Sequence, residues 1–144
     1  RAIVNAHFRF DPPENMPPMM GVIGGLVEWL FAFHNRLSVT ISDAERLVNA
    51  LREELARDIW RDNCKAAPLS SEIAEGPLPP WQIVRERRAT FEATPEQNAM
   101  RPGTVTEWKN LFLAGDLTDT GLPATIEGSI RSGDKAADHI LKMR

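Results

Sequence analysis

The sequence predicts a mixed α/β fold in which short strands and one long helix precede a final strand, loop and helix. Three observations predict this fold. Apolar residues alternate near the N-terminus, they recur at helical spacing in the middle, and near the end an apolar run leads into a glycine-containing loop and a helix start. With 144 residues, 26% of them charged, the chain has the length and composition of an ordinary soluble domain.

The first predicted element is a strand over residues 3–10. Apolar residues such as Val4 and Phe8 alternate there with polar ones, which is typical of a strand with one buried face. His7 falls on the polar side, where an ordinary sheet-face histidine is favoured over a metal ligand or a catalytic group. A proline-rich loop over residues 11–18 follows.

Two further strands, over residues 26–33 and 37–41, are predicted to complete a meander. The glycines in 21–25 lack the spacing of a dinucleotide-binding loop and indicate a bend between strands. The middle strand carries three aromatic residues on one side, namely Trp29, Phe31 and Phe33. Such a stripe usually belongs to the core, and a ligand-lining surface is the alternative left open.

A long helix is predicted over residues 43–65. Ser42 and Glu45 have the spacing of a capping box, and Leu55 and Ile59 belong to an apolar stripe of helical period. The charged residues between them indicate a solvated face. This helix is therefore expected to pack one side on a sheet.

A linker over residues 67–80 and a strand over 81–91 are predicted next. The linker is rich in proline and is the part most prone to disorder. Three basic residues, Arg85, Arg87 and Arg88, lie on the strand. Because they are few and the net charge is −3, paired charges in a sheet are favoured over contact with nucleic acid.

Several functional classes lack support in the sequence. The chain has one cysteine, Cys64, so a disulfide framework is excluded and a reducing compartment is the simpler expectation. The motifs of zinc hydrolases, serine hydrolases and nucleotide triphosphatases are absent from it. Its longest apolar passage is shorter than the roughly 20 residues of a spanning helix, so no transmembrane segment is predicted. Because the zinc-binding motifs are absent, no metal site is predicted either.

The stretch from 111 to 137 is the part with the clearest chemical implication. A buried strand is predicted over 111–114, followed by a polar loop and a helix that begins near Ala124 or Thr125. The first amides of a helix have no internal partners, so a phosphate or an electron-rich ring oxygen would be stabilised there. A stripe of small residues on this helix would let a sheet or a flat ligand approach closely; it consists of Thr125, Gly128, Ser132 and Ala136.

At these residues the chain resembles the C-terminal FAD-binding signature of the amine oxidase and phytoene desaturase flavoprotein superfamily. Within it, the squalene-associated desaturases, understood as hydroxysqualene dehydroxylases, are the most similar group. The resemblance is carried by Phe112-Leu113-Ala114-Gly115-Asp116, by Leu122-Pro123-Ala124-Thr125-Ile126-Glu127-Gly128 and by Ser132-Gly133. It extends upstream, with less specificity, through Ile3-Val4-Asn5, Glu28-Trp29-Leu30-Phe31 and Glu86-Arg87-Arg88-Ala89-Thr90-Phe91.

The resemblance implies FAD as cofactor and a chain that is the C-terminal fragment of a two-domain flavoprotein. Residues 1–108 would then complete a substrate domain with a mixed sheet, and 109–144 would form the last strand, loop and helix of the FAD domain. The glycine-rich N-terminal unit for the ADP half of FAD is not in this sequence, so the fragment alone is expected to be inactive and to lack FAD.

The resemblance also implies the residues nearest the cofactor. Gly115 and Asp116 would lie by the ribityl and phosphate part of FAD, and the amides around Thr125 and Ile126 would face the pyrimidine edge of the flavin. The family signature adds Leu117 and Pro123, and Leu117 stands where many members carry an aromatic residue. No catalytic residue is assigned.

The function implied is oxidoreduction of a long isoprenoid lipid, with removal of the hydroxyl group of hydroxysqualene as first choice. A carotenoid or phytoene desaturase is the alternative, and a non-catalytic interaction module without cofactor is a second one. For such a substrate, the alternative to a core position for the aromatic stripe is a place in the wall of the substrate tunnel. The expected location is the cytoplasm, with peripheral attachment to the inner membrane left open, and the fragment is expected to self-associate through exposed apolar surface.

Overall fold

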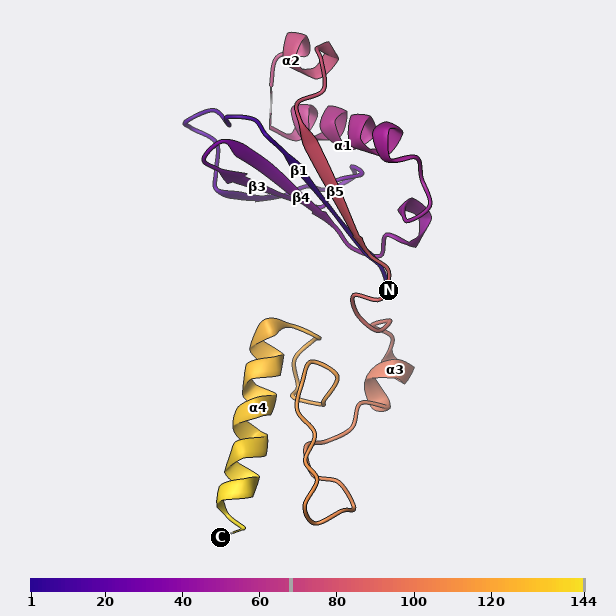
Figure 1. The fold of residues 1–144 in the computed structure, drawn as a ribbon, viewed down its shortest axis with the longest axis vertical. Coiled ribbons are helices and arrows are strands. Elements are labelled where there is room, and N and C mark those ends of the chain that lie inside the picture. The colour runs from indigo at the N-terminus through magenta and orange to yellow at the C-terminus, as the bar shows by residue number, and fades with distance from the viewer. Residues whose placement is uncertain (68, 144) are drawn as a thin grey trace. The chain divides into compact units, whose positions relative to one another are not determined.

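The computed structural model describes residues 1–67 and 69–143, so Pro68 of the predicted linker and Arg144 lie outside the described residues. The chain forms two compact units, unit 1 over Arg1–Ala89 and unit 2 over Thr90–Arg144 (Figure 1). The domain boundary predicted between residues 108 and 109 concerns the FAD domain of a larger enzyme and stays a prediction.

Unit 1 is built on a five-stranded sheet with the order β2-β3-β4-β1-β5. Every pairing in it is antiparallel, which corrects the prediction of a mixed sheet. A turn with Asn35 at a φ of 56° joins β3 to β4, as the predicted meander requires. The strands are β1 (Ile3–Phe8), β2 (Met19–Gly21), β3 (Trp29–Phe33), β4 (Arg36–Ile41) and β5 (Trp81–Glu86).

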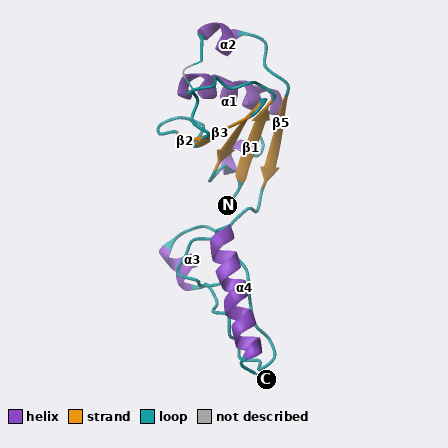
Figure 2. Cartoon of the chain, turned by 90° about the vertical axis from the view of Figure 1, so that its left-hand side faces the viewer, coloured by secondary structure: helices purple, strands orange, loops and turns teal. Residues whose placement is uncertain are grey.

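Helix α1, over Arg52–Ala66, covers one face of this sheet (Figure 2). Val4, Ala6 and Phe8 alternate on β1 and are buried beneath it, so the predicted period of two is confirmed. The ring of Phe8 lies 5.0 Å from that of Trp60. This face therefore holds the core of the unit, and each large side chain buried there contributes roughly 1.5–3 kcal/mol to stability.

The predicted start of the long helix was wrong. Helix α1 begins at Arg52, and the residues before it form a 3-10 turn, η1, over Glu45–Leu47. The capping box does not form because Asp43 has a φ of 47° and Glu45 Oε1 accepts from the amide of Ala2 at 2.8 Å. The carboxylate thus accepts from the Ala2 amide, next to the start of β1, instead of from a helix end.

The predicted linker contains helix α2, over Ser71–Glu75, and packs on the core instead of standing free. Trp60 Nε1 donates to the carbonyl of Ile73 at 3.3 Å. The next strand, β5, ends at Glu86 and not at 91. Arg85 on it donates to the carbonyls of Val48 and Ala50 at 3.0 and 2.7 Å, so main-chain oxygens replace the expected paired charges.

The second face of the sheet, called the open face below, carries no helix among the described residues of unit 1 (Figure 2). Trp29 and Phe33 lie on it with 43% and 46% of their surface exposed, while Leu30 between them is fully buried on the α1 side. The aromatic stripe is therefore outside the core of this unit, contrary to the usual reading of such a pattern.

Unit 2 consists of a short helix α3 (Pro95–Ala99), a long connecting segment and helix α4 (Ile126–Leu141). The strand predicted over 111–114 is not formed as such. Phe112 makes an isolated bridge with Val105, and the amide of Leu113 donates to Thr104 at 2.8 Å. A strand needs a neighbour along its whole length, and the described part of unit 2 offers one for only this short stretch.

Among the described residues, none of the helices combines the length and the apolar character required to cross a bilayer.

Candidate functional site

Helix α4 begins where the sequence predicted, with Thr125 as N-cap. Its backbone is extended, and its hydroxyl accepts from the amide of Gly128 at 3.1 Å. The next two amides, of Ile126 and Glu127, have no hydrogen-bond partner within the described range. Ile126 is 82% exposed. The helix end therefore presents two free N–H groups and the positive end of the helix dipole at an accessible surface.

The small residues of α4 do face inward, but the chain's own loop occupies the space beside them. Gly128, Ser132 and Ala136 are buried. A Cβ added at Gly128 would lie 3.1 Å from the carbonyl oxygen of Pro123. The close approach predicted for a sheet or a flat ligand is thus made by the preceding loop, which corrects that expectation.

A tight turn over Gly115 to Thr118 is attached to the same stripe. Gly115 has a φ of 136°, which favours glycine, and its amide donates to Ser132 Oγ at 3.1 Å. The hydroxyl of Thr118 donates to the Gly115 carbonyl at 2.9 Å and contacts the Ser132 hydroxyl. Both Thr118 and Ser132 are fully buried. This network fixes the predicted Gly115-Asp116 turn on the helix.

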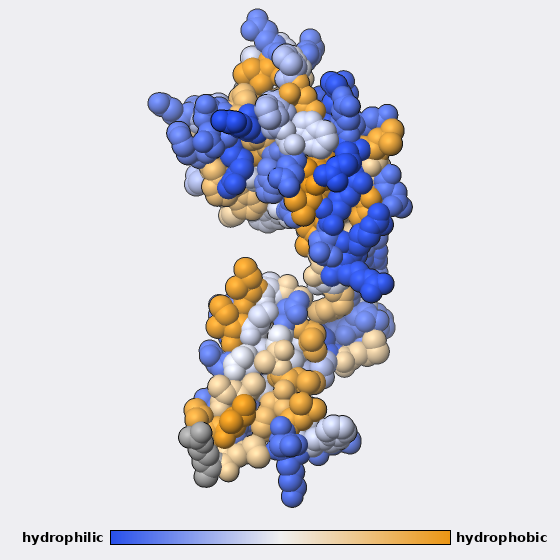
Figure 3. Space-filling view, in the orientation of Figure 1, coloured by the Kyte–Doolittle hydropathy of each residue, from blue (hydrophilic) through white to orange (hydrophobic). Residues whose placement is uncertain are grey.

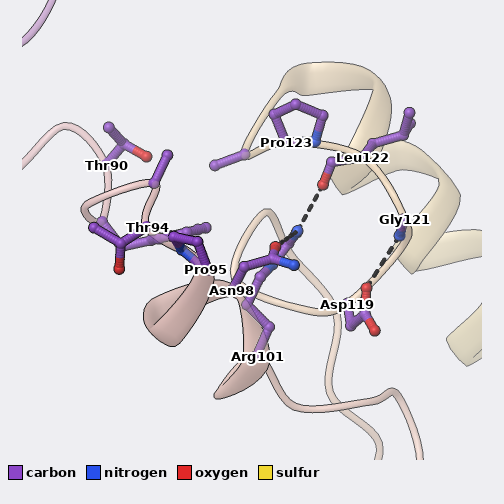
Figure 4. Close-up of a pocket in the computed structure, with 12 residues that line it drawn as sticks. Thr90, Thr94, Pro95, Asn98, Arg101, Asp119, Gly121, Leu122 and Pro123 are labelled. Carbon is purple, nitrogen blue, oxygen red and sulfur yellow. Dashed lines mark hydrogen bonds between the residues drawn. The ribbon is translucent and has the colours of Figure 1, made fainter.

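Arg101 joins the turn to the loop that precedes α4. Its guanidinium donates to the carbonyls of Leu122 at 2.6 Å and Asp116 at 3.0 Å, and also to that of Thr118. Figure 4 shows the side chain pointing from the end of α3 toward the Leu122 carbonyl. It also lies 5.4 Å from the centroid of the Phe91 ring. One guanidinium group therefore donates hydrogen bonds to three main-chain carbonyls.

A cavity of about 580 Å³ lies beside this cluster (Figure 4). Its wall consists of Thr90, Phe91, Ala93, Thr94, Pro95, Asn98, Arg101, Asp119, Gly121, Leu122, Pro123 and Ala124. Of the predicted site residues, only Pro123 lines it. Asp116, Leu117, Thr125 and Ile126 are exposed and Gly115 is half-buried. The structure thus brings the predicted residues onto one loop and helix end held by Arg101, without enclosing all of them in one cavity.

Sequence reasoning missed Arg101, Thr118 and Ser132 as parts of the support. Ser132 was noted for its small size alone. The one signal for Arg101 in the sequence is its position directly before Pro102-Gly103, a pair of residues that marks a loop. Its carbonyl partners lie 15 to 21 residues away, and no local pattern marks such contacts.

The first turn of α4 carries a surface ion pair. Glu127 in the first turn of α4 accepts from Arg131 Nε at 2.7 Å, which partly balances its charge. The described residues contain no cluster of His, Cys, Asp or Glu side chains that could hold a metal ion. At the helix end itself, the backbone of the first turn supplies a partial positive charge, and the Arg101 cation lies on the loop before it.

Comparison with known proteins supports the resemblance. A family model described as flavin containing amine oxidoreductase matches residues 1–141. The chain is 69% identical over 141 residues to the hydroxysqualene dehydroxylase of Rhodopseudomonas palustris, covering 98% of this chain and 32% of that protein. It is 69% identical over 138 residues to the enzyme of that name from Sinorhizobium fredii, covering 96% and 32%.

A third relative has the same description. The hydroxysqualene dehydroxylase of Zymomonas mobilis is 53% identical over 138 residues, again covering 96% of this chain and 32% of that protein. The chain thus spans about a third of the length of the curated relatives it matches.

Proposed function

The chain belongs to the family of flavin-containing amine oxidoreductases, and on that premise we propose that it works as the C-terminal part of an FAD-dependent enzyme that removes the hydroxyl group of hydroxysqualene. The observation that carries the proposal is the 69% identity to hydroxysqualene dehydroxylase over 98% of this chain. The mixed α/β structure, an antiparallel sheet followed by the α4 loop and helix, agrees with a portion of a larger flavoprotein.

The residues at the start of α4 fit the flavin. The amides of Ile126 and Glu127 are free donors, and they would stabilise the negative charge that reduction places on the pyrimidine edge of the ring. The exposed carboxylate of Asp116 suits the hydroxyl groups of the ribityl chain. When bound, reduced FAD would supply the hydride for the reaction.

The open face of the unit 1 sheet fits a wall for an isoprenoid substrate. Trp29 and Phe33 are partly exposed there, and the rings of Phe31 and Phe33 are stacked at 6.5 Å. Aromatic side chains on a rigid sheet exclude water from a long hydrocarbon without requiring polar partners. We propose that the role of the aromatic stripe is to contact the substrate at this surface and not to pack in the core.

The test is turnover by the full polypeptide. With FAD bound and a chemical reductant present, hydroxysqualene should be converted to squalene, as measured by mass spectrometry. In a parallel assay with oxidised FAD and an electron acceptor such as a quinone in place of the reductant, conversion of phytoene to a conjugated polyene, with no action on hydroxysqualene in the first assay, would instead identify a desaturase. A colourless full polypeptide that binds neither FAD nor lipid would identify an interaction module and overturn the proposal.

The position of the flavin can be tested separately with Ile126→Pro. Proline at the first helical position removes the N–H and leaves the helix intact, and the extended backbone of Thr125 is compatible with a following proline. The variant should bind oxidised FAD, but the reduction potential of the bound flavin should become more negative. Ile126→Val keeps the amide and is the matched control. An unchanged potential in Ile126→Pro would place the flavin elsewhere.

A further inference from the structure

One row of side chains crosses the whole open face and contains a histidine. The pairing registers align one residue from each strand in spatial order, namely Met19, Phe31, Ser38, His7 and Gln82. A neighbouring row on the same face consists of Gly21, Trp29, Thr40, Asn5 and Val84. In both rows β3 contributes an aromatic residue and the central strands β4 and β1 contribute polar ones.

The polar residues of these rows are paired with each other. His7 Nδ1 lies 2.9 Å from the hydroxyl oxygen of Ser38, and the Thr40 hydroxyl donates to Asn5 Oδ1 at 2.7 Å. Because Ser38 is buried, its hydroxyl has a fixed position, and its hydrogen bond with Nδ1 orients the imidazole ring. The open face therefore carries a small polar cluster on β4 and β1 beside the aromatic residues of β3.

The second nitrogen of His7 is available to a ligand. Nε2 has no hydrogen-bond partner in the part of the chain that the structure describes, and it is not among the buried polar atoms left without one. His7, Arg36 and Gln82 contribute to the wall of a shallow hollow of about 420 Å³. Burial, and then the nearby charge of Arg36, lower the pKa of His7, so the ring is neutral at neutral pH.

We infer that His7 Nε2, oriented by Ser38, forms a hydrogen bond with the hydroxyl group of a long apolar ligand that lies along the aromatic side of the open face. This inference rests on the proposed function and deepens it. With Ser38 as donor to Nδ1, the proton is on Nε2, which donates to the ligand oxygen. With the other tautomer, Nε2 accepts from the ligand hydroxyl.

The occupant follows from the composition of the face. A pure hydrocarbon would leave Nε2 without a partner on binding, and loss of hydration without a replacement bond weakens affinity. A polar ligand would gain nothing from Trp29, Phe31 and Met19. A hydrocarbon with one hydroxyl group matches both parts. Ser38 is a positioning residue here, because it acts on the ligand through His7.

The experiment measures the dissociation constants of hydroxysqualene and squalene with the full polypeptide in its oxidised, FAD-bound form, where no turnover occurs. The wild type should prefer hydroxysqualene by about fivefold, the value of one neutral hydrogen bond. His7→Phe should remove that preference and raise the affinity for squalene, because squalene then no longer leaves Nε2 without a partner. Ser38→Ala should reduce the preference. Ser38→Thr, which keeps the hydroxyl, should restore it.

Thr40→Val is the matched control, because it removes the neighbouring polar pair from the same face and should keep the preference. If His7→Phe weakens both lipids equally, the residue is merely structural and the inference is overturned. A wild type that binds both lipids without preference also overturns it, while the proposed function survives. A wild type that binds neither lipid contradicts the proposed function itself.

Discussion

The guanidinium of Arg101 lies 2.6 Å from the carbonyl oxygen of Leu122, and this bond holds the loop that leads into helix α4. The same group also donates to the carbonyls of Asp116 and Thr118, so Arg101 links the turn over 115–118 to the loop before α4. The position of the Ile126 amide depends on that loop because α4 begins directly after it.

Arg101→Met should therefore destabilise unit 2 and weaken flavin binding. Three carbonyls lose a charged donor, and unfolding of the chain by urea should show a loss of about 2–4 kcal/mol. Arg101→Lys keeps the charge but not the planar guanidinium group, so its stability should lie between those of the wild type and Arg101→Met. Arg61→Met is the control, since the pair that Arg61 makes within the described residues, with Asp58 at 3.7 Å, is exposed. Equal effects of Arg101→Met and Arg61→Met would contradict this role.

Two glycines of α4 provide a second comparison. Gly133→Ala should stabilise the chain by about 0.5–1 kcal/mol, because a Cβ there meets nothing within 4 Å and alanine favours the helix. Gly128→Ala should be less stable than Gly133→Ala by at least about 1 kcal/mol, since its Cβ would press on the Pro123 carbonyl. Urea unfolding measures both. Similar stabilities of the two variants would mean that the loop does not pack as closely as described.

Stability should fall as the pH is lowered through the range near 6.5. The pKa of His7 in the folded protein is below its ordinary value, mainly through burial and then through Arg36. The unfolded chain therefore takes up a proton first as the pH falls, which favours unfolding, and the contribution is constant above the unfolded pKa. The free energy of unfolding should lose part of this pH dependence in His7→Gln. An identical profile in that variant would exclude the assignment.

A second pH dependence is expected at acid pH. The pKa of Glu45 is lowered, first by the hydrogen bond from the Ala2 amide and also by the charge of Arg1. Its contribution to stability is present above the unfolded value of 4.5 and is lost as the pH falls through the lower, folded pKa. Glu45→Gln should flatten the unfolding profile in this range. Glu75→Gln, in the short helix α2, is the control.

The chain should self-associate through α4. Ile126, Ile130 and Leu141 are exposed on the side of the helix opposite to the buried Gly128 and Ser132, and Figure 3 shows apolar surface on unit 2. Light scattering at increasing concentration should give a rising mass. Ile130→Gln should reduce that rise, and Lys135→Gln should not. A wild type that stays monomeric at all concentrations would contradict this expectation.

Elements set by local patterns were predictable from the sequence. The alternation on β1 and the cap at Thr125 depend on neighbouring residues, and both are found as expected. The capping box at Ser42 failed because the Glu45 carboxylate has a partner 43 residues away. The aromatic stripe was ambiguous for a related reason, since the period of two shows which residues share a face but not which face α1 covers.

The local structure of the candidate site was predictable to the same extent, while its contact with flavin stays a prediction. The helix end is a local feature, and its free amides followed from the cap. The support by Arg101, Thr118 and Ser132 depends on how distant segments meet, and the apolar run at 111–114 met too short a partner to become a strand.

The attachment of the Gly115 turn to Ser132 has a thermodynamic consequence for any ligand at the start of α4. The turn and the helix end are already held in place by hydrogen bonds within unit 2. A ligand that docks there meets a preorganised receptor, so little affinity is lost to the entropic cost of immobilising a flexible loop.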